Sequence, residues 1–226
     1  MKLLLLFSLL IYGQLIYAQD ADALVAAVSS KLALVKDYTA DMHIKAQVPL
    51  IKIDEVDAKV YFKKPNQIKI ESKAIAILPK QGMGELNQFL ANDKAYTTAL
   101  NGTKMLGDVK TSVVSLMPNS ENADIILVKL WIDAQKELIL KSQITSKTNG
   151  TLDVLYYYGS HAKYGLPYKM VFTIDVKKFK LPKSVAADLH QSKKTNTASN
   201  NNQTGTIVIS MRNYVVNQGA GSKHFN

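Results

Sequence analysis

The four histidines are the residues of this sequence best suited to bind a metal ion or to transfer protons near neutral pH. They lie far apart along the chain, at His43, His161, His190 and His224. Metal sites use ligands at short, recurring spacings, and no two of these histidines have such a spacing. The sequence therefore predicts no metal site, and no motif in it requires a cofactor.

The carboxylates offer two pairs for general acid and base chemistry, Asp133 with Asp153 and Glu121 with Asp124. Carboxylates on strands and turns are far more often solvated surface charges. The sequence has no Gly-x-Ser-x-Gly elbow, no glycine-rich phosphate loop and no nucleophile accompanied by a base. These observations favour a protein that is not an enzyme, and an exported enzyme without a recognisable motif is the less favoured alternative.

The composition narrows the class of protein further. The 226 residues include no cysteine, which excludes disulfides, zinc–thiolate sites and cysteine nucleophiles. The net charge is +10, yet Arg212 is the only arginine among the 28 basic residues. Nucleic-acid readers rely on arginine for bidentate contacts, so no nucleic-acid partner is expected. The lysines indicate either a solvated surface or attraction to anionic lipid head groups or an acidic partner.

Residues 1–18 have the layout of a secretory signal peptide. A basic start at Lys2 precedes an apolar run from Leu3 to Ile11, and Ala18 supplies a small residue before a plausible cleavage site. The run is shorter than the roughly 20 residues that span a bilayer, although a membrane anchor is the alternative. We therefore expect residues 19–226 to form a single domain, exported to the periplasm.

The remaining elements follow from hydrophobic periodicity. Apolar residues recur at helical spacing over 20–36, and a short helix is predicted over 85–90. Asn149-Gly150 predicts a type I′ hairpin turn, residues 94–122 show no clear pattern, and 190–204 predict a mobile polar loop. Strands are predicted over 38–48, 56–63, 67–71, 125–133, 137–146, 151–158, 168–176 and 205–216.

These patterns predict an α+β, mostly β fold in which a curved antiparallel sheet is covered by helices. The inner face of that sheet suits either a filled core or a lipid pocket, which needs flexible Met, branched aliphatics and few polar anchors. The short helix and the apolar segment before it suit a lid or an ordinary plug of the core. The candidate ligand-binding residues are Met42, Ile44, Val60, Phe62, Ile68, Ile70, Ile77, Met83, Leu86, Phe89, Leu140, Met170 and Phe172.

Several segments, in this order, resemble a known family. Residues 38–40 open a long strand after a helix, and residues 62–71 read as a strand, a basic-Pro turn and a strand. The central strand 128–133 follows, and then Gly165-Leu166-Pro167 before a further strand. Together they resemble the periplasmic carriers that sort outer-membrane lipoproteins, the LolA/LolB-like superfamily.

The resemblance implies an unclosed β-barrel covered by helices, with an apolar cavity that shields acyl chains in the periplasm. It also implies an inner-membrane donor and an outer-membrane acceptor for the cargo. Lys69 occupies the position where the best-known carriers use an arginine to hold the lid shut. The same fold also occurs in a periplasmic stress-sensing regulator that binds a signalling partner.

The first hypothesis is therefore a monomeric periplasmic carrier that binds the acyl chains of a lipoprotein, or another lipid, and moves them towards the outer membrane. Burying an acyl chain of roughly fourteen carbons contributes on the order of 10 kcal/mol, at about 0.8 kcal/mol per CH₂ group. The second hypothesis is a periplasmic sensor or adaptor of the same fold that binds a membrane-protein partner.

Overall fold

The computed structural model describes residues 20–48, 54–72, 86–148, 150–175, 204–220 and 222–225. The predicted signal peptide, the candidate residues Ile77 and Met83, and the polar tract up to residue 203 lie outside these ranges. Among the described residues, no helix is long and apolar enough to cross a membrane.

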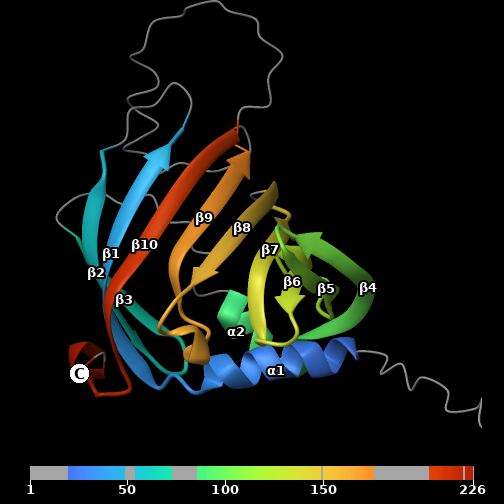
Figure 1. Cartoon of the computed structure of the whole chain (residues 1–226), viewed down its shortest axis with the longest axis horizontal. Helices are drawn as coiled ribbons and strands as arrows, with labels where there is room; N and C mark the ends of the chain where they lie inside the picture. Colours follow the sequence, from blue (N-terminus) through green and yellow to red (C-terminus); the bar gives the residue numbers. More distant parts are fainter. Residues whose placement is uncertain are drawn as a thin grey trace, which may run out of the picture.

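Ten strands of the described chain form one antiparallel sheet in the order β3-β2-β1-β10-β9-β8-β7-β6-β5-β4 (Figure 1). The sheet curves strongly, but its edge strands β3 and β4 do not pair, so it is not closed into a barrel. In chain order, the strands are β1 (Asp37–Gln47), β2 (Val56–Lys63), β3 (Gln67–Ser72), β4 (Tyr96–Leu106), β5 (Val109–Pro118), β6 (Ile125–Asp133), β7 (Leu138–Ser146), β8 (Gly150–Tyr158), β9 (Pro167–Asp175) and β10 (Thr204–Val216). This architecture confirms the predicted fold class.

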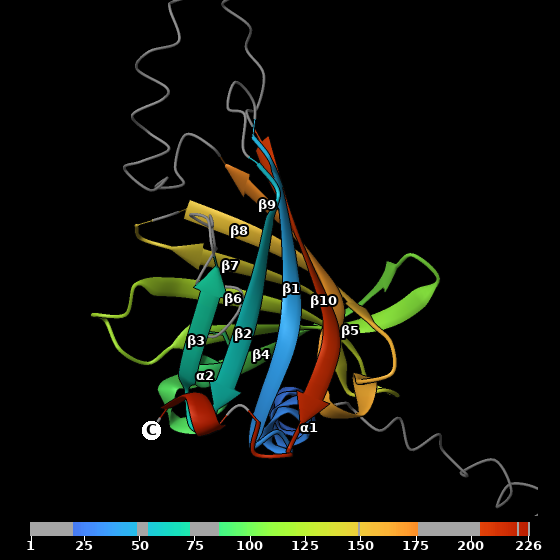
Figure 2. The same ribbon diagram turned by 90° about the vertical axis from the view of Figure 1, so that its left-hand side faces the viewer.

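Short helical turns accompany the sheet. The 3₁₀ turns are η2 (Asp93–Ala95), η3 (Ala162–Tyr164) and η4 (Ser222–Phe225). The last of them lies beside β2 (Figure 2), where the His224 ring stacks on Tyr61 with centroids 3.7 Å apart. The carboxy-terminal turn therefore covers part of the outer face of the sheet.

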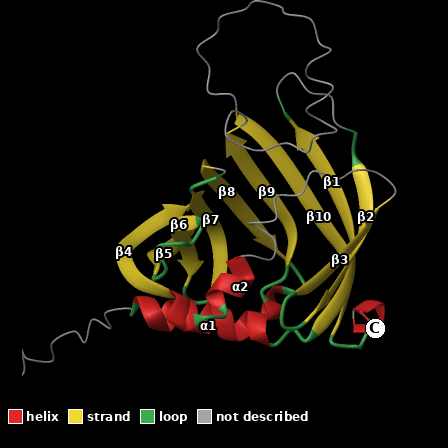
Figure 3. Ribbon diagram, turned by 180° about the vertical axis from the view of Figure 1, so that it is seen from behind, coloured by secondary structure: helices red, strands yellow, loops and turns green. Residues whose placement is uncertain are grey.

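Helices α1 (Ala21–Ala33) and α2 (Leu86–Leu90) lie together at one end of the sheet, with α2 on its concave side (Figure 3). Helix α1 begins at Asp20 because that side chain caps it, accepting a hydrogen bond from the Asp22 backbone N–H at 3.1 Å. Its buried residues Leu24, Val25 and Val28 recur at helical spacing, so one face of α1 packs on the sheet.

Buried side chains form two clusters on the inner face of the sheet. The helix-covered cluster joins α1 and α2 to β4–β7, and the strand cluster lies on β1, β2 and β8–β10. The helix-covered cluster comprises Ala21, Leu24, Val25, Val28, Leu86, Leu90, Tyr96, Val114, Leu116, Val128, Leu130, Ile132, Ile139 and Ile144. The strand cluster comprises Ala40, Met42, Ile44, Val56, Val60, Leu152, Val154, Met170, Phe172, Ile174, Ile207, Ile209 and Met211.

The predicted hairpin between β7 and β8 is present, but the predicted turn is wrong in detail. Gly150 pairs with Ser146 and has φ 71°. A two-residue turn centred on Asn149 and Gly150 would instead pair the residues on either side of them. Gly150 therefore begins β8 in a left-handed conformation rather than forming the second half of a type I′ turn.

Residues 94–122, which showed no pattern, contain the hairpin of β4 and β5. Most of β4 is exposed on both faces, so its sequence does not alternate between apolar and polar residues. The turn lies between the paired residues Leu106 and Val109, and Gly107 adopts φ 59° there. Gly107-Asp108 is a recognised hairpin dipeptide and was a local signal for this turn.

Candidate ligand-binding cavity

A cavity of about 60 Å³ lies between the helices and the inner face of the sheet, lined by residues of both clusters. Helix α1 contributes Val28 and Leu32, and α2 contributes Leu86 and Asn87. The other lining residues are Tyr38, Glu137, Leu138, Ile139, Tyr156, Tyr158, Gly165, Leu166, Pro167, Met170, Met211 and Tyr214. An apolar cavity of about 150 Å³ accepts a benzene molecule, so an acyl chain needs more room than this conformation provides.

Most of the predicted ligand-binding residues lie on the inner face, as the alternation indicated. Met170 and Leu86 line the cavity directly. Met42, Ile44, Val60 and Phe172 are buried members of the strand cluster. The interior around the cavity is thus packed by the chain's own side chains.

Two predicted aromatic residues pack against tyrosines. Phe62 stacks on Tyr38 with ring centroids 5.2 Å apart, and Phe89 lies 4.9 Å from Tyr96 in a tilted arrangement. Phe89 packs against the helix-covered cluster. Phe62 thereby supports a tyrosine that lines the cavity.

Three further predicted residues, on β3 and β7, are not buried members of either cluster. Ile68 is 40% exposed because β3 is an edge strand, while Ile70 on the same strand is partly buried against the strand cluster. Leu140 was expected to alternate inward, but a β-bulge pairs Ile139 with Ile132 and Lys141 with Trp131. Leu140 therefore has no partner on β6, and Ile139 takes the core position instead.

Four tyrosines line the cavity, and the sequence interpretation did not single them out: Tyr38, Tyr156, Tyr158 and Tyr214. The Tyr158 hydroxyl donates to the Ile139 carbonyl at 2.8 Å, and the Tyr214 hydroxyl donates to the Pro167 carbonyl at 3.0 Å. The Tyr156 hydroxyl lies 2.9 Å from the Ser142 hydroxyl. The run of tyrosines at 156–158 was an available signal, because alternation places its first and last members on one face.

Burial keeps these phenols neutral. It raises the pKa of Tyr38 and of Tyr156 to about 12, and it raises the pKa of Tyr158 and of Tyr214 well above the ordinary tyrosine value. Each therefore remains a hydrogen-bond donor throughout the physiological pH range. The cavity combines an apolar lining with a small number of fixed polar groups, which is typical of small-molecule sites.

Helix α1 is joined to neighbouring elements by a few polar contacts near the cavity. The Ser29 hydroxyl donates to the Leu90 carbonyl of α2 at 3.2 Å. The Lys31 ammonium donates to the Lys136 carbonyl and lies 3.5 Å from the Glu137 carboxylate. Such partly exposed contacts are individually weak, so apolar packing provides most of the attachment of α1.

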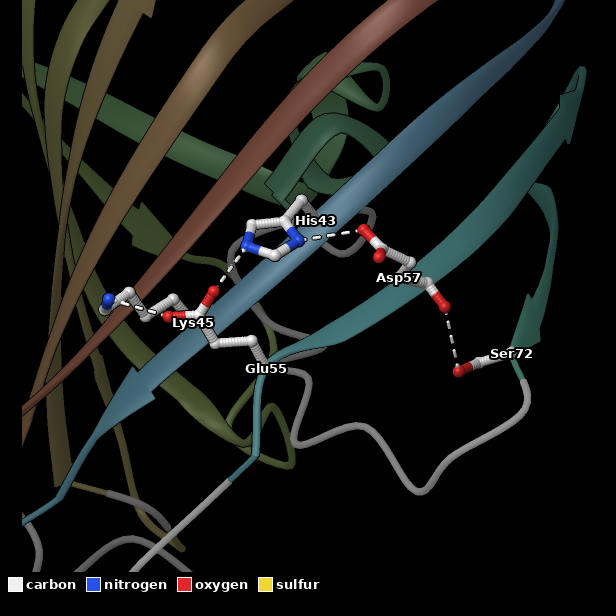
Figure 4. Close-up of polar contacts among 5 residues, drawn as sticks. All are labelled: His43, Lys45, Glu55, Asp57 and Ser72. Atoms are coloured by element: carbon white, nitrogen blue, oxygen red, sulfur yellow. Dashed lines mark hydrogen bonds and ion pairs between the residues drawn. The ribbon is translucent and has the colours of Figure 1, made fainter.

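The outer face carries a separate polar cluster around His43 (Figure 4). His43 Nδ1 lies 2.8 Å from an Asp57 carboxylate oxygen, and His43 Nε2 lies 3.0 Å from a Glu55 carboxylate oxygen. Lys45 pairs with the same Glu55 at 2.6 Å. The hydrogen bonds that Glu55 accepts from Lys45 and from His43 lower the pKa of its carboxyl group. Within the described ranges, no three His, Cys, Asp or Glu side chains are grouped so as to hold a metal ion.

Three of the four carboxylates considered for acid and base chemistry have structural partners. Asp133 accepts hydrogen bonds from the backbone N–H groups of Gln135 and Lys136, each at 3.1 Å, and so caps the turn after β6. Asp153 pairs with Lys141 across the outer face at 2.9 Å. Asp124 accepts a hydrogen bond from the Thr148 hydroxyl at 2.9 Å.

Lys69 faces away from the cavity. It lies opposite Tyr61 on β2, whereas the neighbouring Ile70 lies opposite the buried Val60. Its ammonium pairs with Glu71 on the outer face at 2.9 Å. The position at which the resemblance implied a lid-holding residue therefore makes an outer-face contact.

A curved, unclosed antiparallel sheet with helices over its concave side is the LolA/LolB-like fold. No protein-family model and no curated protein matches the sequence. Among solved structures, the chain is similar to a DUF1329 family protein from Desulfovibrio piger, with a TM-score of 0.58 and 10% identity over 91% of this chain and 95% of that one.

Two further structures share the fold. An outer membrane lipoprotein-sorting protein domain from Vibrio parahaemolyticus matches with a TM-score of 0.55 and 10% identity, over 92% of this chain and 97% of that chain. A LolA superfamily protein from Nitrosomonas europaea matches with a TM-score of 0.55 and 11% identity, over 87% of this chain and 93% of that chain. At such low identity the likeness concerns the fold alone.

Proposed function

We propose that this protein is a periplasmic carrier that binds the acyl chains of a lipoprotein, or of another lipid, between α1 and the inner face of the sheet, and moves them towards the outer membrane. The observation that carries the proposal is the tyrosine-rimmed cavity where the two apolar clusters meet. The predicted signal peptide and the fold shared with a lipoprotein-sorting protein domain support the compartment and the class of cargo.

The cavity must enlarge to accept a chain, and the composition of its walls makes this feasible. Met170 and Met211 line the cavity, and Met42 is buried in the same strand cluster. Methionine is unbranched and adapts its side-chain conformation to a new neighbour at small cost. An entering acyl chain therefore displaces these side chains and the apolar face of α1 rather than breaking strand pairing.

No catalytic group is needed for this activity. The charged His43 cluster lies on the outer face, where His43 is held through both ring nitrogens. The apolar energy of chain burial supplies the affinity, at about 0.8 kcal/mol per CH₂ group. We therefore propose that the protein works by binding and release rather than by chemistry.

The test is lipid binding by the purified protein, with extraction of co-purified lipid and titration of a fluorescent fatty acid ester. We expect the wild-type protein to bind the probe. The combined variant Met42→Ile, Met170→Ile, Met211→Ile replaces flexible side chains with branched ones of similar volume. We expect it to bind about fivefold more weakly, which corresponds to about 1 kcal/mol.

The matched control is Met105→Ile with Met117→Ile, because both methionines are exposed and lie outside the clusters. It should bind as the wild type does. A wild-type protein that neither co-purifies with lipid nor binds the probe contradicts the carrier function. Retention on a membrane-protein partner without lipid binding would favour the sensor or adaptor, and turnover of an ester or glycoside would favour an enzyme.

A further inference from the structure

The four tyrosines of the cavity differ in one respect. Three of the hydroxyls have a protein partner, supplied by Ser142, by the Ile139 carbonyl and by the Pro167 carbonyl. For the Tyr38 hydroxyl, no described residue accepts a hydrogen bond. Because this hydroxyl is not fully buried, a ligand oxygen that accepts its hydrogen bond would take the place of water.

The Tyr38 ring is held in place by its neighbours. It stacks on Phe62 at 5.2 Å and meets the edge of Tyr214 at 5.5 Å. The side chain packs against the strand cluster, which contains the three methionines described above. A ligand oxygen at Tyr38 would therefore sit where an attached acyl chain can continue along the methionine-bearing wall.

The charges around the cavity determine which kind of ligand oxygen can bind at Tyr38. Among the described residues that line it, Glu137 is the only ionised side chain, and no lysine, arginine or histidine is among them. An anionic head group would find no counter-ion on the wall. Because burial raises the pKa of Tyr38 to about 12, its phenol offers a neutral donor. Neutral acceptors such as ester and amide carbonyls match this environment better than free carboxylates.

We propose that Tyr38 is the polar anchor of the cavity, donating a hydrogen bond to an ester or amide carbonyl at the head of a bound acyl chain. The proposal rests on the carrier function and makes it specific, because it predicts selection of neutral acyl esters and amides over hydrocarbons and over free fatty acids. Tyr38 positions the head of the chain, and the apolar wall holds the tail.

The experiment compares three pyrene-labelled probes of equal chain length: a methyl ester, the free acid and the hydrocarbon. Wild-type protein should bind the ester about 3- to 10-fold more tightly than the hydrocarbon, the range expected for one hydrogen bond. It should also bind the ester more tightly than the acid. Tyr38→Phe retains the ring and its stacking, so it should bind the hydrocarbon as the wild type does and lose the preference for the ester.

The matched control is Tyr158→Phe, which removes a cavity hydroxyl that already has a protein acceptor. It should keep the preference for the ester, and thermal melting should show that both variants are folded. A Tyr38→Phe protein that still prefers the ester overturns the anchor, and equal affinity of the wild type for ester and acid overturns the selection of neutral lipids. Binding of none of the probes to the wild type overturns the carrier function itself.

Discussion

The two halves of the inner face differ in how they are built. The helix-covered cluster contains branched aliphatic residues from α1, α2 and four strands, with no methionine among its buried members. The strand cluster contains Met42, Met170 and Met211, and no helix contributes to its buried members. Both clusters contain branched aliphatic side chains, which have few conformations, and only the strand cluster adds flexible methionines. We therefore expect the strand cluster to be the more adaptable of the two walls.

The cavity lies at the boundary between these halves. Tyr156 packs against both clusters, and its hydroxyl is within hydrogen-bonding distance of Ser142 on β7. A ligand at this boundary would contact the less adaptable wall on one side and the more adaptable wall on the other. Under the proposed function, this difference would let a tightly packed interior accommodate a flexible chain.

The largest effect should come from truncating one residue in each half. Leu130 is fully buried in the helix-covered cluster, and Leu130→Ala should lower the free energy of unfolding by about 2–5 kcal/mol. Met170→Ala should cost an amount in the same range, but it also widens the existing cavity. We therefore expect only Met170→Ala to gain binding of a small apolar probe such as benzene, measured by ligand-induced stabilisation in urea.

Leu100→Ala serves as the control, because this side chain is exposed at the sheet edge and its loss should change stability by less than about 0.5 kcal/mol. Equal gain of benzene binding by Leu130→Ala and Met170→Ala would remove the distinction between the halves.

A smaller effect on the free energy of unfolding should appear at alkaline pH, and it should come from the buried tyrosines of the cavity. In the folded protein the pKa of Tyr38 and of Tyr156 is raised from 10.0 to about 12, because burial disfavours the phenolate. The contribution of these neutral, buried phenols to the free energy of unfolding is fully present below about pH 10. It is lost as the pH rises through about 12, because the tyrosines of the unfolded chain ionise at lower pH than those of the folded protein. Each tyrosine should account for about 2–3 kcal/mol of that loss, at about 1.36 kcal/mol per pKa unit.

The measurement is the free energy of unfolding in urea at a series of alkaline pH values. Tyr156→Phe should make the decline shallower, whereas Tyr168→Phe, at an exposed tyrosine, should leave it unchanged. A decline of the same steepness in Tyr156→Phe would show that this buried phenol does not contribute to it.

The smallest effect concerns the outer face. Lys69→Ala removes an exposed ion pair with Glu71, so the free energy of unfolding should fall by less than about 1 kcal/mol. Fatty acid ester binding should stay at the wild-type level, as it should for Lys69→Arg. Tighter or weaker lipid binding in Lys69→Ala alone would restore to Lys69 the lid-holding position that the resemblance implied.

The strands that pair on both sides and bury one face could be predicted from the sequence. Ala40, Met42 and Ile44 alternate with Asp41 and His43 in β1, and the burial of this strand follows the same period. Strand β6 was predicted with the bounds that the structure has. In such strands the apolar period of two is a direct consequence of having one buried face.

The edges and bulges could not be predicted in the same way. An edge strand such as β4 buries little, so its sequence has no need to alternate. The bulge that displaces Leu140 depends on pairing with β6, which local periodicity cannot report. The cavity tyrosines come from β1, β8 and β10, and only the assembled sheet brings them together.

The missing pairing between β3 and β4 has a mechanical consequence. A closed barrel has a circumference fixed by its strand number and stagger, so its lumen can widen only if a ladder of hydrogen bonds breaks. With one seam left open, this sheet can uncurl slightly and change the volume that it encloses while every inter-strand ladder stays intact. In the proposed carrier, this change of curvature would let the sheet expand around a bound chain and contract after its release.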